Sequence, residues 1–167
     1  MNKPGGSLRQ AALWAGLLAL VVGGAAGGAE LATKHALTLE IAKQMSAAAE
    51  AEAVRNNWNM VIAIVDDGGR LMHLIRRDGT QYGSIDVAQD KARTAIAFRR
   101  PTKALEDAVA GGRTAILGLT GAIPVEGGLP IVVNGEMIGA IGVSGGSSPQ
   151  DAQVAQAGIN ALATILK

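Results

Sequence analysis

Two histidines, His35 and His73, are the only side chains in this 167-residue sequence that combine metal ligation with acid–base chemistry near neutral pH. The sequence contains no cysteine, which excludes thiolate ligands and thiol nucleophiles. Two imidazoles cannot build a three-histidine zinc site, and neither the H-E-x-x-H nor the G-x-S-x-G motif occurs. The chemistry that remains for a histidine is that of a single ligand or of a structural imidazole.

The two histidines lie in different contexts. His73 alternates with Leu71 and Ile75, which predicts that its side chain shares their face of a sheet, as a half-buried structural imidazole or as a ligand. His35 lies in residues 30–37, which we expect to be a flexible segment before the first helix. It is either part of a linker or a ligand that reaches a pocket.

Asp86 and Asp90 lie four residues apart on one face of a predicted helix, and Arg93 follows three residues later. Like charges at this spacing repel slightly, and Arg93 can neutralise Asp90 in a solvated cluster. Paired carboxylates also suit hard cations or ferrous iron. The pattern therefore leaves open a solvated surface cluster and a peripheral iron site.

Lys91 lies about 140° round the same predicted helix from Asp86, by the 100° turn per residue of an α-helix. Its neighbours on that face include the small or apolar residues Val87, Thr94 and Ala95. An amine in such a position either forms part of a pocket wall or extends its aliphatic stem to reach solvent. We keep both interpretations.

Glycines near the carboxyl end carry a clearer signal. Gly127 and Gly128 lead into Pro130 and a strand, while Gly139 and Gly142 fall within a strand. Glycine weakens a strand, so it indicates close approach by a helix, a neighbouring subunit or a flat ligand. The spacing matches neither the phosphate-binding loop nor the dinucleotide fingerprint, which argues against nucleotide binding.

Composition excludes several classes of protein. Lys and Arg number 15 against 14 Asp and Glu, a net charge of +1, so nothing resembles a basic nucleic-acid surface. Aromatic residues make up 2% of the chain, too few for base-stacking platforms. With 49% hydrophobic and 17% charged residues, the chain is not intrinsically disordered.

The first 29 residues resemble a cleavable signal peptide. Lys3 and Arg9 precede the apolar run of residues 11–22, and small residues follow. The run is shorter than the roughly 20 residues that span a bilayer, although counting the following glycines and alanines extends it enough for an uncleaved anchor. We expect cleavage and export, so that the mature protein is periplasmic or secreted and has no stable membrane span.

The remaining residues, 38–167, alternate helical and strand periodicities and form one predicted domain. Asn134-Gly135 between two apolar runs is typical of a two-residue hairpin. We expect Thr38, Thr102 and Ser148 to cap helices. The predicted helices cover 38–55, 84–98, 102–112 and 150–166, and the predicted strands cover 60–65, 70–76, 129–133 and 136–144, with an extra strand near 122–125 left open.

The predicted order is therefore αββααββα, with two hairpins. Because hairpins join antiparallel strands, we expect an α+β fold with a mainly antiparallel sheet and helices packed on it. So few aromatic residues leave a core of Ala, Val, Ile and Leu, and such a thin core favours burial against copies of the same chain. We expect a homo-oligomer.

Across residues 36–166 the order of short motifs resembles the HbpS/GlcG haem-binding family. Each motif alone is common, whereas their combined order is specific. The motifs, in chain order, are Val65-Asp66-x-x-Gly69-x-Leu71, Arg77-x-Asp78-Gly79, Lys91-Ala92-Arg93-Thr94-Ala95, Arg100-Pro101-Thr102, Glu126-Gly127-Gly128-x-Pro130-Ile131, Asn134-Gly135-Glu136, Ile138 to Gly145, and Asp151-x-x-x-Ala155-x-Ala157-Gly158.

The resemblance implies an α+β fold of the GlcG and PduO C-terminal type, which is profilin-like, and a haem cofactor. Some family members degrade haem slowly, and others sense redox state or iron beside a membrane kinase. An axial threonine occurs in some members near the segment that holds Thr120 and Ala122 here. The acidic iron motif of the sensors is matched at Asp86, whereas Gln89 replaces another acidic position.

We expect a haem pocket between the helix of residues 91–100 and the Gly127-Gly128 turn. Imidazole is a stronger donor to ferric haem than a hydroxyl group, so we expect His35→Ala to perturb a hemin spectrum more than His73→Ala. The residues expected to bind the cofactor are His35, His73, Lys91, Arg93, Thr94, Arg100, Thr102, Thr120, Gly127, Gly128 and Pro130, with Asp86 and Asp90 expected for iron.

Two classes of function follow from the resemblance. The first is an exported haem-binding protein that degrades haem or serves a membrane sensor partner. The second is a non-catalytic, oligomeric accessory subunit of the GlcG type that binds a small organic acid or no ligand. Neither class binds nucleic acid.

Overall fold

The computed structural model describes residues 29–167. The signal-peptide prediction falls on residues 1–29 and therefore lies almost wholly outside the described residues. The chain divides into two units, Met1–Thr33 and Lys34–Lys167, and every described helix and strand belongs to the second. No helix in the described range is both long enough and apolar enough to cross a membrane.

The second unit has four α-helices, four strands and one short 3-10 helix. In chain order the elements are α1 (Leu39–Arg55), β1 (Val61–Asp66), β2 (Leu71–Arg76), α2 (Gly83–Ala97), α3 (Lys103–Ala110), η1 (Thr114–Gly118), β3 (Gly128–Val133), β4 (Glu136–Ser144) and α4 (Ser148–Ile165). The predicted αββααββα order is confirmed, with the 3-10 helix added. The extra strand that the sequence left open near residues 122–125 does not form, because that segment is irregular.

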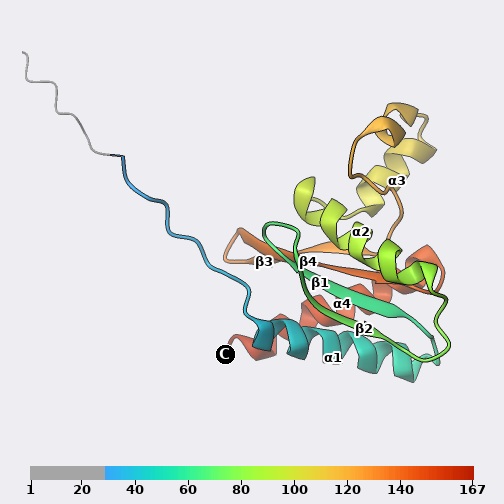
Figure 1. Ribbon diagram of the computed structural model, residues 1–167, viewed down its shortest axis with the longest axis horizontal. Coiled ribbons are helices and arrows are strands. Elements are labelled where there is room, and N and C mark those ends of the chain that lie inside the picture. The colour runs from blue at the N-terminus through green and yellow to red at the C-terminus, as the bar shows by residue number, and fades with distance from the viewer. Residues whose placement is uncertain (1–28) are drawn as a thin grey trace, which may run out of the picture. The chain divides into compact units, whose positions relative to one another are not determined.

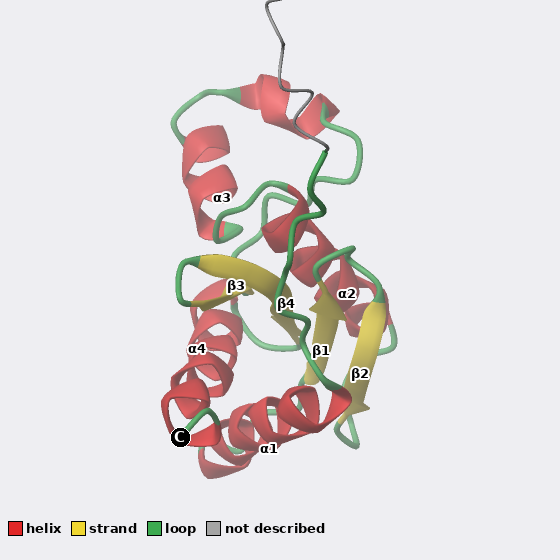
Figure 2. Ribbon diagram, turned by 90° about the vertical axis from the view of Figure 1, so that its left-hand side faces the viewer, coloured by secondary structure: helices red, strands yellow, loops and turns green. Residues whose placement is uncertain are grey.

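The sheet order is β2-β1-β4-β3, and all three pairings are antiparallel. Figure 1 shows α2 on one face of this sheet, with α1 and α4 on the other. Figure 2 shows α3 set apart from the sheet, beyond the α2 face. The structure therefore confirms the predicted α+β class with a mainly antiparallel sheet.

Local signals explain most element ends. The Thr38 hydroxyl accepts a hydrogen bond from the Ile41 amide at 3.3 Å, as expected for a helix cap. Asn134 and Gly135 have positive φ values of 50° and 82°, as a type I′ hairpin requires. The cap of α4 is Ser147, one residue before the predicted Ser148, because Ser147 forms a capping box with Gln150.

The core fills both faces of the sheet with small and branched side chains. Ile62, Ile64 and Ile141 pack toward α1 and α4, while Val61 and Ala63 pack toward α2. The Gly142 position allows the backbone of α2 to lie directly on β4, because a Cβ there would come within 2.1 Å of the Ala88 carbonyl oxygen. For this glycine, close approach by a helix explains the pattern.

Candidate functional site

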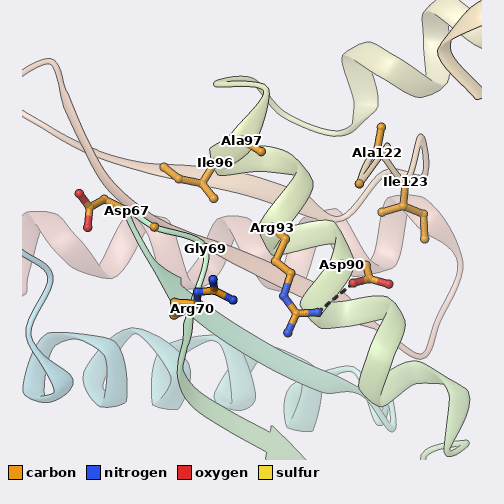
Figure 3. Close-up of a pocket in the computed structure, with 11 residues that line it drawn as sticks. Asp67, Gly69, Arg70, Asp90, Arg93, Ile96, Ala97, Ala122 and Ile123 are labelled. Carbon is orange, nitrogen blue, oxygen red and sulfur yellow. Dashed lines mark hydrogen bonds and ion pairs between the residues drawn. The ribbon is translucent and has the colours of Figure 1, made fainter. Parts of the chain in front are cut away.

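A cavity of about 480 Å³ lies on the α2 face of the sheet, within the range of roughly 300–1,000 Å³ common for small-molecule sites. Three elements form its walls: the β1–β2 turn, the second half of α2 and an irregular loop before β3 (Figure 3). The lining residues are Asp67, Gly68, Gly69, Arg70, Asp90, Arg93, Ile96, Ala97, Gly121, Ala122 and Ile123.

The β1–β2 turn is held by one carboxylate. The Asp66 side chain accepts hydrogen bonds from the Gly68 and Arg70 amides, at 2.9 and 2.8 Å. The Asp66 amide in turn donates to the Arg70 carbonyl oxygen at 2.9 Å. Gly69 has a φ of 72°, a conformation that favours glycine. A Cβ at this position would lie 3.7 Å from the side chain of Ile96 in α2. The turn therefore presents Arg70 from a well-ordered backbone.

Thr94 holds the opposite wall. It is fully buried in α2, and its hydroxyl donates to the Gly121 carbonyl oxygen at 3.2 Å and accepts from the Ile123 amide at 3.0 Å. The sequence predicted Thr94 as a cofactor-binding residue. In the structure it positions the loop that lines the cavity, and it is not itself part of the lining.

The lining carboxylates each have a cation of their own. Asp90 pairs with Arg93 at 3.0 Å, which confirms the solvated pair that the sequence suggested. Asp67 pairs with Lys34, and the hydrogen bond from Lys34 lowers the pKa of Asp67. Within residues 29–167, no carboxylate forms an ion pair with Arg70. The cavity thus holds one guanidinium group without an acidic partner.

Residues 34–37 run along the two hairpin ends beside the cavity. His35 is exposed, and its Nδ1 lies 2.7 Å from a carboxylate oxygen of Glu136 at the start of β4. That hydrogen bond lowers the pKa of Glu136. Leu37 is buried, and its side chain lies beside Gly139. The flexible segment stays a prediction for residues 30–33, and the next four residues contact the domain.

Lys91 is buried and is not one of the residues that line the cavity. Its ammonium group lies 2.7 Å from a carboxylate oxygen of Asp151, and both side chains are at most 3% exposed. The other Asp151 oxygen accepts from the Gly146 amide at 3.0 Å. Burial raises the pKa of Asp151, and the nearby ammonium opposes that shift. Neither interpretation from the sequence is correct. The aliphatic stem of Lys91 does not reach solvent, and its ammonium group forms a buried ion pair and not part of a pocket wall.

The Gly127-Gly128 turn leaves no space for a ligand against α2, contrary to the expected position of the pocket. A Cβ at Gly128 would come within 2.3 Å of the Lys91 carbonyl oxygen. The Thr102 hydroxyl accepts a hydrogen bond from the Gly128 amide at 2.9 Å. It makes no capping hydrogen bond to α3, although the sequence had suggested that it would. These residues join the start of β3 to the helices.

The other predicted site residues are dispersed. His73 is half-buried in β2 opposite Ile64, and a register shift pairs Leu71 with Val65. Because neighbouring strand residues face opposite sides, His73 shares a face with Ile75, as predicted, whereas the register shift places Leu71 on the other face, contrary to the prediction. The remaining predicted residues, Asp86, Arg100, Thr120 and Pro130, lie outside the cavity lining, with Thr120 next to Gly121.

The sequence analysis missed Asp67, Arg70, Ile96 and Ile123 as cavity residues. The signal for the first two was present, because Asp66-Asp67-Gly68-Gly69 between two apolar runs predicts a tight turn. No sequence pattern indicates which helix such a turn will face. Among the described residues, no group of three or more His, Asp or Glu side chains could hold a metal ion.

A second hollow of about 420 Å³ lies at the other end of β2. It is polar, and its lining residues are Glu50, Asn59, Arg76, Arg77 and Asp78. Arg77 donates to the Trp58 carbonyl oxygen, and the Arg76 guanidinium lies 4.8 Å from the centre of the Tyr82 ring. The first cavity differs in having an apolar wall, formed by Ile96 and Ile123, as well as cations.

The fold itself belongs to a known class. The chain is a member of the HbpS-like family, whose model carries the description haem degrading protein HbpS-like and matches residues 37–160. The predicted resemblance is confirmed.

Three relatives show how near the match is. Protein GlcG of Escherichia coli strain K12 is 45% identical over 112 residues, which cover 67% of this chain and 84% of GlcG. A double mutant of HbpS from Streptomyces reticuli is 34% identical, with a TM-score of 0.74 over 83% of this chain and 94% of that one. The PduOC:heme complex is 31% identical, with a TM-score of 0.70 over 76% and 95%.

Proposed function

We propose that this chain is an exported haem-binding protein and that haem occupies the cavity between the β1–β2 turn and α2. The observation that carries the proposal is the combination of an apolar wall and free positive charge in one cavity. Haem is a flat apolar ring with two carboxylates, so it suits such a lining. A relative of the same fold has been solved as a complex with haem, which supports this choice of ligand.

The lining fits the ring and its propionates, and the iron ligand must come from beside it. None of the 11 lining residues is a histidine, methionine, tyrosine or cysteine. Thr120 adjoins the lining residue Gly121, and His35 adjoins Lys34, which pairs with the lining residue Asp67. Bound haem would supply the redox and oxygen chemistry, and the protein would bind, orient and shield it.

Absorption spectra of the purified chain during a hemin titration test the proposal. We expect a Soret band that saturates at one haem per chain. His35→Ala should shift this band more than His73→Ala, because His73 lies in β2 outside the lining. Superimposable spectra from both variants and the wild type would favour an oxygen ligand such as Thr120. A titration without saturation would contradict haem binding.

The second candidate is an accessory subunit of the GlcG type that binds a small organic acid. The 45% identity to GlcG favours it, and the guanidinium group of Arg70 would suit a carboxylate. Isothermal titration with a small dicarboxylate, in the absence of hemin, distinguishes the two functions.

We further propose that the chain is exported, that it assembles into a homo-oligomer and that it acts together with a membrane sensor partner. The residues before the domain support export by their charged start and apolar run. Exposed leucines in the described part of the chain support assembly. A peripheral iron site at Asp86 and Asp90 has less support, because Asp90 already pairs with Arg93.

A further inference from the structure

The cavity contains two guanidinium groups whose electrostatic surroundings differ. Arg93 donates to Asp90 and to Gln89, each at 3.0 Å, so its charge is largely neutralised within α2. Arg70 has no ion-pair partner among the described residues: Asp67, the lining carboxylate of the same turn, is paired with Lys34, and Asp66 accepts from the Arg70 backbone amide. The positive charge that remains in the cavity therefore belongs to Arg70.

The position of Arg70 suits recognition better than that of an ordinary surface arginine. Its amide and carbonyl groups both hydrogen-bond to Asp66, so the side chain extends from a fixed backbone. Figure 3 shows the guanidinium groups of Arg70 and Arg93 in the space between the β1–β2 turn and α2. A planar guanidinium can bind one carboxylate through two parallel hydrogen bonds.

We infer that Arg70 selects the ligand of this cavity by binding a carboxylate, with the apolar body of the ligand against Ile96 and Ile123. The inference rests on the proposed function and adds the group that recognises the ligand. The carboxylate is a propionate if the ligand is haem, and the acid group itself if the ligand is a small organic acid. Arg70 does not bind the iron in either case.

The test compares hemin with hemin dimethyl ester, in which both propionates are neutral. Arg70→Gln should weaken hemin binding by roughly tenfold to a hundredfold, the usual effect of losing a hydrogen-bonded charge pair. The ester should bind the wild type and Arg70→Gln equally, since it offers no carboxylate to lose. The Soret maximum of bound hemin should stay unchanged in the variant, because the iron ligand is unaltered.

Arg76→Gln is the matched control. Arg76 ends the same strand that Arg70 precedes, is also exposed and lines the second hollow, so the variant loses the same charge outside the first cavity. Hemin binding by Arg76→Gln should equal that of the wild type. Circular dichroism melting curves check that both variants fold.

The outcomes separate the inference from the proposed function. Wild-type affinity for hemin in Arg70→Gln, or equal losses in both variants, overturns the role of Arg70 while haem binding stands. If the wild type binds succinate and not hemin, and Arg70→Gln abolishes the succinate binding, the role of Arg70 holds and the haem function fails. If the ester loses affinity in Arg70→Gln as hemin does, Arg70 acts through packing and the inference is wrong.

Discussion

Thr94 shows how one hydroxyl group can control a cavity that it does not line. It joins α2 to both ends of the segment Gly121–Ile123, and it is completely buried. Thr94→Val keeps the volume and leaves the Ile123 amide without its partner. We expect the free energy of unfolding to fall by about 1–3 kcal/mol, together with weaker ligand binding. Urea unfolding and a hemin titration measure the two effects.

The control for Thr94 is Thr114→Val in η1, where the threonine is exposed and its hydroxyl makes no hydrogen bond in the described part of the chain. It should change stability by less than about 0.5 kcal/mol. Equal stability of Thr94→Val and the wild type would show that the loop is held by other contacts.

The buried Lys91–Asp151 pair makes a second prediction. Lys91→Met removes the charge that opposes the desolvation of Asp151, so the pKa of Asp151 should rise further. Near neutral pH the variant should lose about 3–5 kcal/mol in free energy of unfolding, because it leaves an unpaired carboxylate buried. Urea unfolding measures the loss, and Lys43→Met, at an exposed lysine of α1, provides the control.

The pH dependence of that loss has a defined sign. An acid with a raised pKa in the folded state stabilises the fold below its unfolded pKa, and the contribution is lost as pH rises through the folded pKa. The raised pKa of Asp151 in Lys91→Met should therefore make the deficit relative to the wild type narrow as pH falls from 7 toward about 4. A deficit independent of pH would indicate that lost packing, not charge, causes it.

At the scale of elements, the contact between α2 and β4 depends on the absence of a side chain. Gly142→Ala would place a Cβ within 2.1 Å of the Ala88 carbonyl oxygen and 2.6 Å of the Ala92 amide. Helix α2 must then move away from the sheet. We expect a loss of about 1–3 kcal/mol in thermal or urea unfolding.

Gly83→Ala is the control for this substitution. Gly83 begins α2, has no positive φ, and a Cβ there would meet nothing within 4 Å. It should be neutral or slightly stabilising, because alanine favours the helix more than glycine does. If Gly142→Ala unfolds with the same free energy as the wild type, α2 tolerates a shift away from β4 and the prediction is wrong.

For the whole molecule, we predict self-association. Leu117 and Leu119, in and after η1, are 62% and 44% exposed, in a segment where Ile116 is the buried residue. Apolar side chains grouped in this way commonly mark contacts with other chains. Light scattering should give a mass that is a multiple of the chain's, which is 16.9 kDa at full length. A monomer at micromolar concentration would contradict the prediction.

A further prediction concerns processing of the whole chain. If the first 29 residues direct export, the mature protein should begin between Gly27 and Glu30. Mass spectrometry of the periplasmic fraction measures the mature mass. A variant with Lys3 and Arg9 both changed to Glu should stay unprocessed, because the positive start is lost. Intact Met1 on exported wild-type protein would contradict cleavage.

The sequence by itself determined the elements of this protein and their order. Thr38, the Asn134-Gly135 turn and Pro149 act through residues within a few positions of them, so their effect can be predicted without the rest of the fold. The motif order likewise identified the family, because it depends on residue types and spacing alone.

Only the tertiary structure decided which elements meet. Lys91 pairs with Asp151, which lies 60 residues later in the sequence. The three walls of the cavity, which are the Asp67–Arg70 turn, α2 and the loop at Gly121, meet only because β1 pairs with β4. Such contacts arise from burial and strand pairing, which are not encoded by local spacing. Arg70 therefore looks in the sequence like an ordinary turn arginine, and the fold alone leaves its charge unpaired in a cavity.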